Sequence, residues 1–339
     1  MQSRQYTIVD IANRTGVAPS TVSRVFSGHP GISEKTRAKV LEMAEELGYV
    51  RNMYASFMRK PKSLVVGLII PDVKNDFYST MATVLAGFCR DHSFQMILCS
   101  TDDYQLSEEK QTKALVEARI AGIIIAPSVN PSKNTIKYLR SVPTVQVHRH
   151  IPEIGGQLVR MEESTGTRMA TEHLLSLGHR RIAYVGTRGD LSTGADRLKG
   201  FYAAYAAAGL EPDTSLVALC PPRAREGKDA VCRMLSFPQP PSALILGSTE
   251  ISASSLQALA EKGLNIPRDI SIIGYGDNLW NELLVPPLTA IRLPIEDVAQ
   301  EAANALFSML GEECSAPSVQ TFHTELVVRQ STARYSHSL

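Results

Sequence analysis

Small hydrogen-bonding side chains crowd one short segment near the N-terminus of the chain. Val22 and Val25 are three residues apart and are expected to pack inward, so the residues around them face outward on a short helix. The outward residues are Pro19, Ser20, Thr21, Ser23 and Arg24. Hydroxyl and guanidinium groups at this density suit hydrogen bonds to the phosphates and base edges of a DNA major groove. The competing interpretation is an ordinary solvated helix face.

Three predicted helices position this segment. The first begins after Thr7, whose hydroxyl can cap the helix while the Asp10 carboxylate reaches back to form a capping box. Gly16 permits a tight turn, and Pro19 suits the first turn of a second helix because its missing N–H is not needed there. A third helix is expected over residues 33–48. Two short helices joined by a glycine turn and braced by a third form a helix-turn-helix, so we expect DNA contacts from Thr7 and from the second helix.

Charge is distributed unevenly along the chain. Residues 1–60 hold nine Lys/Arg and five Asp/Glu, a net charge of +4, whereas the whole chain has a formal net charge of +1. The N-terminal head is therefore the end that faces a polyanion, and its affinity for DNA should fall as salt rises. Because +4 is modest, one head should bind weakly, and a homodimer that presents two heads would remedy this.

Beyond the head, short apolar runs alternate with segments of helix length. The runs are residues 64–70, 95–98, 122–125 and 144–147, and the pattern restarts at 181–186, 242–246 and 270–274. Such runs are typical of buried parallel strands joined by crossover helices. The fold class predicted is an N-terminal all-α head followed by an α/β body of two Rossmann-like lobes, similar to the periplasmic-binding-protein type.

Residues that follow these strands are the candidates for binding a small molecule. Ligands of open α/β sheets bind outside the carboxyl ends of the strands, so two facing lobes define a cleft. The candidates are Phe77, Arg149, Thr193, Arg197, Ser248 and Asp277. An aromatic ring can stack on a ligand ring and a guanidinium can pair with an anion, although each of these residues could instead be structural.

Enzymatic and metal chemistry find little support in the sequence. His148 and His150 have a His-x-His spacing, but no further ligands accompany them, so no metal site is expected. The chain has no Gly-rich phosphate loop with Lys, no Gly-x-Ser-x-Gly elbow and no His-Glu-x-x-His motif. Its five cysteines are dispersed, which argues against a disulfide framework or structural zinc. We therefore expect no catalytic residue, no cofactor and no enzyme activity.

Composition places the chain among ordinary globular proteins. It has 339 residues, of which 44% are hydrophobic and 20% charged, enough for two or three compact units. The longest apolar run, residues 64–71, is far too short for a bilayer, and the N-terminus lacks the pattern of an export signal. A cytoplasmic protein without a membrane partner is expected.

Sequence motifs in both parts of the chain resemble one family. In the head they are TIVDIA at 7–12, GVAPSTVSRV at 16–25, SEKTR at 33–37 and LGY at 47–49. In the body they are LGHRRIA at 177–183, RLKGF at 197–201, ISIIGY at 270–275, PLT at 287–289 and LVVRQS at 326–331. These segments resemble the LacI/GalR family of bacterial transcriptional regulators over nearly the whole chain. The resemblance implies a homodimer that binds double-stranded operator DNA and responds to a small molecule.

Residues 50–63 are expected to be a hinge helix and linker. The segment is too short to be a stable helix alone in water, and in the family it becomes helical when two copies meet in the minor groove. The resemblance implies further DNA contacts from Asn52, Ala55 and Met58. Met58 stands where the family has a Leu wedge, whereas Arg51 and Ser56 replace the usual Pro and Arg. An ordinary linker is the alternative.

Two departures from the family pattern bear on the ligand. Gly276 stands where the family's effector-facing acid usually follows the Gly-aromatic pair, and Ser248 with Thr249 replaces a common Asn-Asp pair. Carboxylates that would hold neutral sugar hydroxyls are thus depleted. We expect a carbohydrate-related effector that is not a plain hexose and is acidic or phosphorylated, held by Arg149 and Arg197.

The predicted domains are a helix-turn-helix domain at 1–49, a hinge at 50–63, an effector-binding and dimerisation core at 64–331 and a tail at 332–339. In the core, the N-lobe is expected at about 64–163 and 293–322, and the C-lobe at about 164–291 and 323–331. The expected function is a repressor whose operator affinity is set by the effector. A co-repressor-dependent repressor and an activator remain alternatives, and a free solute-binding protein is a remote one.

Overall fold

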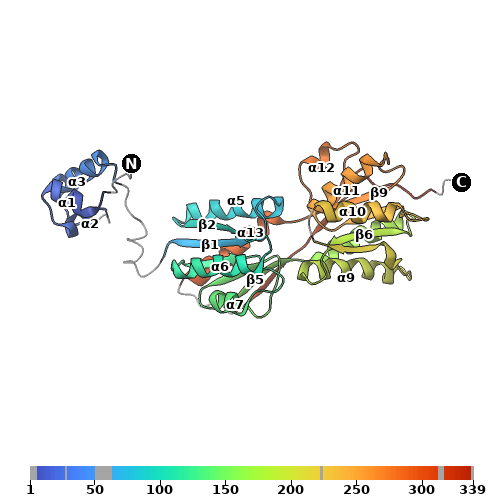
Figure 1. Cartoon of the computed structure of the whole chain (residues 1–339), viewed down its shortest axis with the longest axis horizontal. Helices are drawn as coiled ribbons and strands as arrows, with labels where there is room; N and C mark the ends of the chain where they lie inside the picture. The colour runs from blue at the N-terminus through green and yellow to red at the C-terminus, as the bar shows by residue number, and fades with distance from the viewer. Residues whose placement is uncertain (1–5, 27–28, 50–62, 222–223, 312–316, 337–339) are drawn as a thin grey trace. The chain divides into compact units, whose positions relative to one another are not determined.

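The computed structural model describes residues 6–26, 29–49, 63–221, 224–311 and 317–336, and the chain divides into two compact units, 1–62 and 63–339 (Figure 1). The predicted hinge contacts of Asn52, Ala55 and Met58 lie outside the described residues. Among the helices that are described, none is both long and apolar enough to span a bilayer.

The first unit contains the three helices that the sequence predicts: α1 (Ile8–Thr15), α2 (Pro19–Phe26) and α3 (Glu34–Glu46). The capping box at α1 is confirmed, because Thr7 N donates to Asp10 Oδ2 at 2.7 Å and Asp10 N donates to Thr7 Oγ1 at 3.4 Å. Gly16 ends α1 with a φ of 70°, a left-handed conformation that suits glycine. The buried residues Ile11, Ala12, Val22, Val25, Val40 and Ala44 form one small core. This arrangement is a helix-turn-helix with a bracing third helix.

The N-lobe of the second unit is a parallel sheet covered by helices on both faces. Its strands are β1 (Val65–Ile70), β2 (Gln95–Ser100), β3 (Gly122–Ile125), β4 (Thr144–Val147), β5 (Gln157–Met161) and β11 (Val319–Phe322), in the order β11-β5-β4-β3-β1-β2. One face packs against α5 (Asp76–Asp91) and α13 (Ile295–Leu310), and the other against α6 (Gln105–Glu117) and α7 (Lys133–Arg140).

The C-lobe repeats the same plan. Its strands are β6 (Ile182–Thr187), β7 (Val217–Cys220), β8 (Ala243–Leu246), β9 (Ser271–Tyr275), β10 (Thr289–Arg292) and β12 (Glu325–Val327), in the order β12-β10-β9-β8-β6-β7. Helices α8 (Glu163–Ser176) and α9 (Ser192–Ala207) cover one face, and α10 (Ala224–Leu235) and α11 (Thr249–Glu261) cover the other. The 3-10 helix η1 (Thr214–Leu216) precedes β7, and α12 (Trp280–Leu283) follows β9. Strand β12 alone in this sheet pairs antiparallel, with β10.

The chain passes between the lobes three times (Figure 1). The passages are β5 to α8, β10 to α13 and β11 to β12. Each sheet is therefore assembled from segments far apart in sequence, and α13 packs into the N-lobe core although it follows the last long strands of the C-lobe. Because these three connections join the two lobes, the carboxyl ends of the parallel strands in both sheets face a shared cleft.

Candidate functional site

The outer face of α2 is the first candidate site. Pro19, Ser20 and Arg24 are exposed, and Thr21 and Ser23 are partly exposed, whereas Val22 and Val25 are buried. The helix therefore presents a guanidinium and several hydroxyls to solvent, as expected from the sequence, and Thr7 is also exposed at the start of α1. Donors and acceptors on so short a helix can reach base edges and phosphates together.

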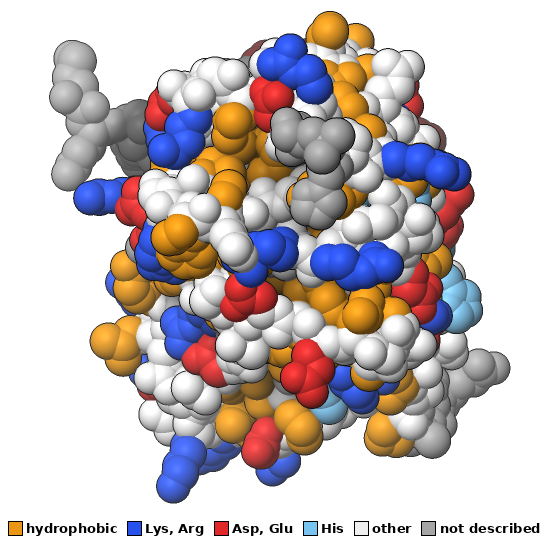
Figure 2. Space-filling model, turned by 90° about the vertical axis from the view of Figure 1, so that its right-hand side faces the viewer, with side chains coloured by type: hydrophobic (Ala, Val, Ile, Leu, Met, Phe, Trp, Pro, Cys, Tyr) orange, Lys and Arg blue, Asp and Glu red, His pale blue; other side chains and the backbone are white. Residues whose placement is uncertain are grey.

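The face of the body seen in Figure 2 carries charges of both signs. There the Lys and Arg side chains are interspersed with Asp and Glu rather than gathered into one field. Such mixing suits a solvated surface and gives little attraction for a polyanion.

The second candidate site is a cavity between the two lobes. It is lined by Asn75, Phe77, Tyr78, His148, Arg149, Thr187, Leu191, Thr193, Arg197, Ser248, Thr249, Tyr275 and Leu293. The cavity has a volume of about 50 Å³. Five of the six predicted effector residues, Phe77, Arg149, Thr193, Arg197 and Ser248, come together in this lining.

The N-termini of three helices converge on the cavity. Asn75 caps α5 by accepting from Phe77 N at 2.9 Å, and Ser248 caps α11 by accepting from Ile251 N at 3.2 Å. Helix α9 begins beside Leu191, which lines the cavity and makes no side-chain capping bond. Because helix N-termini carry partial positive charge, the site favours an anionic or strongly hydrogen-bonding ligand.

Arg197 is held by a buried carboxylate that sequence reasoning missed. Its Nε lies 2.8 Å from Glu163 Oε2 and its Nη2 lies 3.1 Å from Glu163 Oε1, while Nη1 donates to Gly247 O at 2.7 Å. The guanidinium carbon also lies 3.9 Å from the centre of the Tyr275 ring. Only 5% of the Arg197 side chain and 2% of the Glu163 side chain are exposed.

Glu163 has further partners from both lobes. The Tyr275 hydroxyl donates to Glu163 Oε2, and His148 Nδ1 lies 3.2 Å from Glu163 Oε1. Burial alone would raise the pKa of Glu163, but the Arg197 charge and the His148 contact outweigh it and hold that pKa far below its usual range. For His148, burial has the opposite effect and lowers the pKa, so the imidazole is neutral near pH 7.

Arg149 is paired in a different way. Its Nη1 donates to Asp103 Oδ1, and its Nη2 donates to Asp103 Oδ2 at 3.0 Å. Nη1 also lies 3.3 Å from Pro127 O. The Arg149 side chain is 7% exposed, whereas that of Asp103 is 29% exposed. Both cleft arginines therefore already have carboxylate partners, which the sequence did not reveal.

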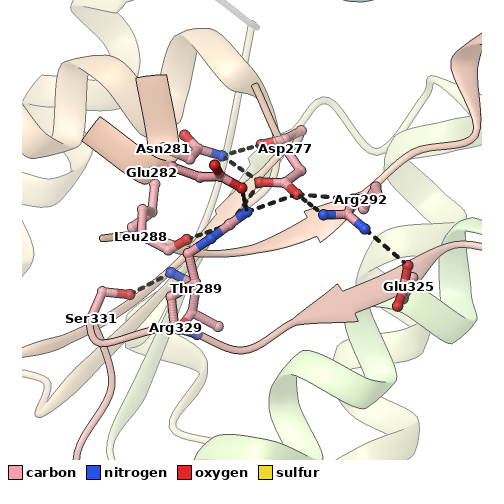
Figure 3. Close-up of polar contacts among 10 residues, drawn as sticks. Asp277, Asn281, Glu282, Leu288, Thr289, Arg292, Glu325, Arg329 and Ser331 are labelled. Carbon is pink, nitrogen blue, oxygen red and sulfur yellow. Dashed lines mark hydrogen bonds and ion pairs between the residues drawn. The ribbon is translucent and has the colours of Figure 1, made fainter. Parts of the chain in front are cut away.

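Asp277 corrects one prediction, because it does not line the cavity. Its carboxylate accepts from Arg329 Nη1 at 2.7 Å, from Arg292 Nη2 at 2.7 Å and from Asn281 Nδ2 at 3.3 Å (Figure 3). Burial alone would raise the pKa of Asp277, but the hydrogen bonds from Arg329 and Arg292 hold it below the usual range. One residue beyond Gly276, whose φ is 84°, the side chain turns toward β10 and β12 instead of the ligand side.

Polar contacts close the cleft across the two lobes. Asn75 Nδ2 donates to Glu250 Oε1 at 2.6 Å, and Asn278 Nδ2 donates to Asp76 Oδ2 at 2.9 Å. His150 N donates to Ser192 Oγ at 3.1 Å. Each bond joins an N-lobe residue to a C-lobe residue, so the three together hold a closed arrangement.

Some cavity polar groups still lack partners. Within the part of the chain that the structure describes, the Thr187 hydroxyl is buried and makes no hydrogen bond. It lies at the end of β6 and lines the cavity, so a ligand group could satisfy it. Its position directly after an apolar strand was a signal that sequence reasoning did not use, whereas nothing in the spacing of Glu163, Asp103 and Tyr275 marked them.

The described residues contain no group of three or more His, Cys, Asp or Glu side chains that could hold a metal ion. The cavity lining offers hydrogen bonding, ion pairing and aromatic contact. Phe77 and His148 form one wall, with ring centres 4.4 Å apart. This set of groups is that of a binding site.

Comparisons with known proteins match both parts of the chain. Residues 7–52 match the model described as "Bacterial regulatory proteins, lacI family", and residues 171–332 match a periplasmic binding protein-like domain. The chain is 30% identical over 331 residues to the HTH-type transcriptional regulator DegA of Bacillus subtilis (strain 168), covering 96% of this chain and 98% of that protein.

Solved structures show the same architecture. The transcriptional regulator CelR in complex with cellobiose is 27% identical with a TM-score of 0.72, covering 96% of this chain and 100% of that chain. The Lac repressor dimer bound to operator and the anti-inducer ONPF has a TM-score of 0.83 and 22% identity, covering 97% of this chain and 100% of that chain. The latter likeness supports the fold alone.

Proposed function

The chain belongs to the LacI family of bacterial regulatory proteins, which are DNA-binding transcriptional regulators and not enzymes, and from this premise we propose that it is a repressor controlled by a small acidic effector in the interlobe cavity. Operator DNA and an effector are the partners of this family. The effector's chemistry and the sign of regulation are the parts proposed for this chain.

The outward face of α2 supports operator recognition by this chain. Pro19, Ser20, Thr21, Ser23 and Arg24 would contact the major groove, with Thr7 on the phosphate backbone. Two heads are needed for tight binding, since one carries little net charge. A regulator of operator DNA works where the bacterial chromosome lies, so we propose a cytoplasmic location.

The single observation that carries the effector proposal is the gathering of five of the predicted effector residues with three helix N-termini around one cavity. Phe77 and His148 suit the face of a sugar-like ring, and the Thr187 and Thr193 hydroxyls suit its polar substituents. A solved relative is a complex with cellobiose, which supports a carbohydrate-related ligand here. The helix ends and Arg149 favour a ligand that also carries negative charge.

A homodimer is proposed because apolar side chains remain exposed in one segment of the C-lobe. Leu279 is 78% exposed, Leu283 74% and Val285 98%. Exposed apolar side chains that cluster in this way mark a protein contact surface, and a second copy would also supply the second head. Sedimentation of the full chain should show a dimer, and a monomer at micromolar concentration would contradict this part of the proposal.

Operator binding is tested by selecting DNA fragments with the purified full chain and measuring affinity at several salt concentrations. Arg24→Gln should weaken binding and flatten the dependence of log K on log salt by about one unit for each phosphate that the protein no longer neutralises. Lys110→Gln is the matched control, because Lys110 is an exposed cation on α6 of the body and should leave the slope unchanged. Equal effects of the two variants would count against recognition by α2.

The sign of regulation requires a second measurement. Titrating candidate sugar acids into the complex with a selected fragment should release DNA if the protein is an inducible repressor. Tighter DNA binding would instead indicate a co-repressor or an activator. Reciprocity also demands that the operator change the affinity for the effector by the same factor.

A further inference from the structure

The two cleft arginines differ in whether a ligand can take the place of their carboxylate partner. Glu163 is 2% exposed, is hydrogen-bonded by Arg197 and Tyr275, and lies 3.2 Å from His148 Nδ1 of the other lobe. Replacing it would break contacts in both lobes at once. The Arg197–Glu163 pair is therefore a fixed part of the cavity wall.

Asp103 is held by one residue only. Among the described residues, the hydrogen bonds made by its carboxylate all come from Arg149, and 29% of the side chain is exposed. Asp103 also lies in the short connection between β2 and α6, outside any strand or helix. A side chain in this situation can leave its partner without disrupting either sheet.

Asp103 lies in a tight turn of the backbone. Asp102 has a φ of 53° and Asp103 a φ of 61°, so two successive non-glycine residues adopt the left-handed conformation. This conformation is unfavourable for residues with a side chain and persists only where other contacts impose it. The backbone turn is closed separately, because Tyr104 N donates to Thr101 O at 3.0 Å, so the turn does not depend on the side-chain bonds to Arg149.

Arg149 cannot follow Asp103 into solvent. Its side chain is 7% exposed, lines the cavity and is also bonded to Pro127 O. A buried guanidinium without an anion is strongly unfavourable, so a departing carboxylate must be exchanged for another anion. The Asp103 pairing already shows the geometry that Arg149 accepts, in which both carboxylate oxygens meet the two terminal nitrogens.

We propose that Asp103 is an internal stand-in for the carboxylate of the effector, and that an acidic effector binds by displacing Asp103 from Arg149 while the Arg197–Glu163 pair stays intact. The inference rests on the proposed effector function and specifies it: the ligand carries a carboxylate, and Asp103 sets the threshold that the ligand must overcome. A neutral sugar makes no such exchange and leaves the connection after β2 in place.

A cation on the opposite lobe is available to the released Asp103. Arg188 lies in the connection after β6 and is paired with Asp190. The hydrogen bond to Asp190 raises the pKa of Arg188, and the negative charge of Asp103 on the other lobe raises it further. Both members of the Arg188–Asp190 pair are about half exposed and can rearrange. Exchange at Arg149 would thus strengthen attraction between the lobes at the mouth of the cleft.

The test uses the full chain and sodium acetate as the probe. Asp103→Ala leaves Arg149 without its carboxylate and should lower the Tm. Sodium acetate should then raise the Tm of this variant by at least about 3 °C more than sodium chloride does at the same ionic strength. The reason is that a ligand that binds only the folded state stabilises that state. Acetamide, which is neutral and of similar size, should not. The Tm of the wild-type protein should rise less with acetate, because its own Asp103 competes with acetate for Arg149.

Two further variants make the result decisive. Asp190→Ala removes a carboxylate from an exposed arginine and should show no acetate-specific gain. The double variant Asp103→Ala/Arg149→Met should lose the gain. Equal effects of acetate and chloride on Asp103→Ala, or rescue that survives in the double variant, would overturn the inference. Rescue by inorganic phosphate but not by acetate would overturn the carboxylate assignment.

Operator binding measured on the same samples separates this inference from the proposed function. If the wild-type protein binds a selected fragment and acetate gives no specific effect on Asp103→Ala, only the stand-in role fails. If the wild-type protein binds no fragment, the proposed regulatory function fails whatever acetate does.

Discussion

At the scale of single residues, Asp277 joins separate segments of the C-lobe. Arg292 ends β10, and Arg329 lies beyond β12 and also bonds Leu288 O at 2.9 Å (Figure 3). Asp277→Ala should lower the free energy of unfolding by about 3 kcal/mol, because two guanidinium groups lose their common anion and the Arg329 side chain is only 11% exposed. Urea unfolding measures this change.

Asp190→Ala is the control for Asp277→Ala. It removes an ion pair whose side chains are 49% and 44% exposed, so the loss should stay below about 1 kcal/mol. Similar losses for the two variants would contradict a structural role for Asp277.

His148 gives the body a dependence on pH. Burial lowers the pKa of His148 in the folded protein, so the unfolded chain takes up a proton near pH 6.5 that the folded chain does not. Stability is therefore full above about pH 6.5 and falls as the pH drops below it, by up to about 1.4 kcal/mol per pH unit for one proton.

Urea midpoints of the wild-type chain and of His148→Asn, compared at pH 7.5 and 6, test this dependence. Asparagine tolerates the φ of 64° at this position and does not titrate. The variant should show a shallower decline toward low pH. Parallel declines would show that His148 does not contribute, since burial also lowers the pKa of His150, His173 and His179.

Some cavity residues could be predicted from one rule, namely that ligand-binding residues follow the strands of a parallel sheet. Phe77, Arg149 and Ser248 follow apolar strands, and parallel strands bring their carboxyl ends to one edge, so these residues meet. Glu163 and Arg197 are 34 positions apart, and Glu163 and Tyr275 are 112 apart. Their contacts depend on how two helices and two lobes pack, which periodicity does not specify. The same limit explains why Asp277 was assigned to the cavity.

At the scale of elements, α8 and α9 pack through direct backbone contact. A Cβ atom added at Gly200 of α9 would lie 2.1 Å from the carbonyl oxygen of Ser164 in α8. Gly200→Ala should therefore force the helices apart and lower the free energy of unfolding by about 2 kcal/mol. Thermal or urea unfolding of the full chain checks this.

Gly87→Ala in α5 is the matched control for Gly200→Ala. The added methyl group there would meet only the end of the Arg90 side chain, at 3.7 Å. Since alanine favours helices more than glycine does, this variant should be unchanged or more stable, by up to about 1 kcal/mol. Destabilisation of both variants would indicate a general sensitivity to helix substitution instead of a close approach at Gly200.

Three buried strands match the bounds expected from the sequence. Strands β3, β4 and β8 are buried along their whole length and have the bounds expected from the sequence to within a residue. Strands β7, β11 and β12 lie at sheet edges and are partly exposed. Polar residues interrupt the apolar ones in β11 and β12, whereas β7 is apolar throughout and was still not predicted. Such strands are fixed by their neighbours, and the sequence pattern did not reveal them.

At the scale of the whole body, the arrangement of the lobes depends on acidic residues at the mouth of the cleft. Burial raises the pKa of Glu250, and the nearby Asp72 and Asp76 raise it further. Glu250→Gln keeps an acceptor for Asn75 Nδ2 but removes the charge repulsion between the lobes. We expect this variant to favour the closed arrangement, seen as a smaller radius of gyration in solution scattering at pH 7.5.

Trp280, the single tryptophan of the chain, provides a second readout of closure. It lies two residues beyond Asn278, which bonds Asp76 of the N-lobe. Asn278→Ala removes that bond and should shift Trp280 emission and the radius of gyration in the direction opposite to Glu250→Gln. Identical shifts in the two variants would show that these contacts do not control the lobes.

The three passages between the lobes also constrain how the polypeptide can fold during its synthesis on the ribosome. The N-lobe sheet begins to emerge first, yet Val298, Ala302 and Leu306 of α13, which fill its core, are translated only after most of the C-lobe. Until then the nascent N-lobe has an uncovered apolar face that is prone to aggregation. A message truncated before codon 295 would therefore yield a chain in which neither lobe is complete, so quality control in the cell acts on this body as one unit.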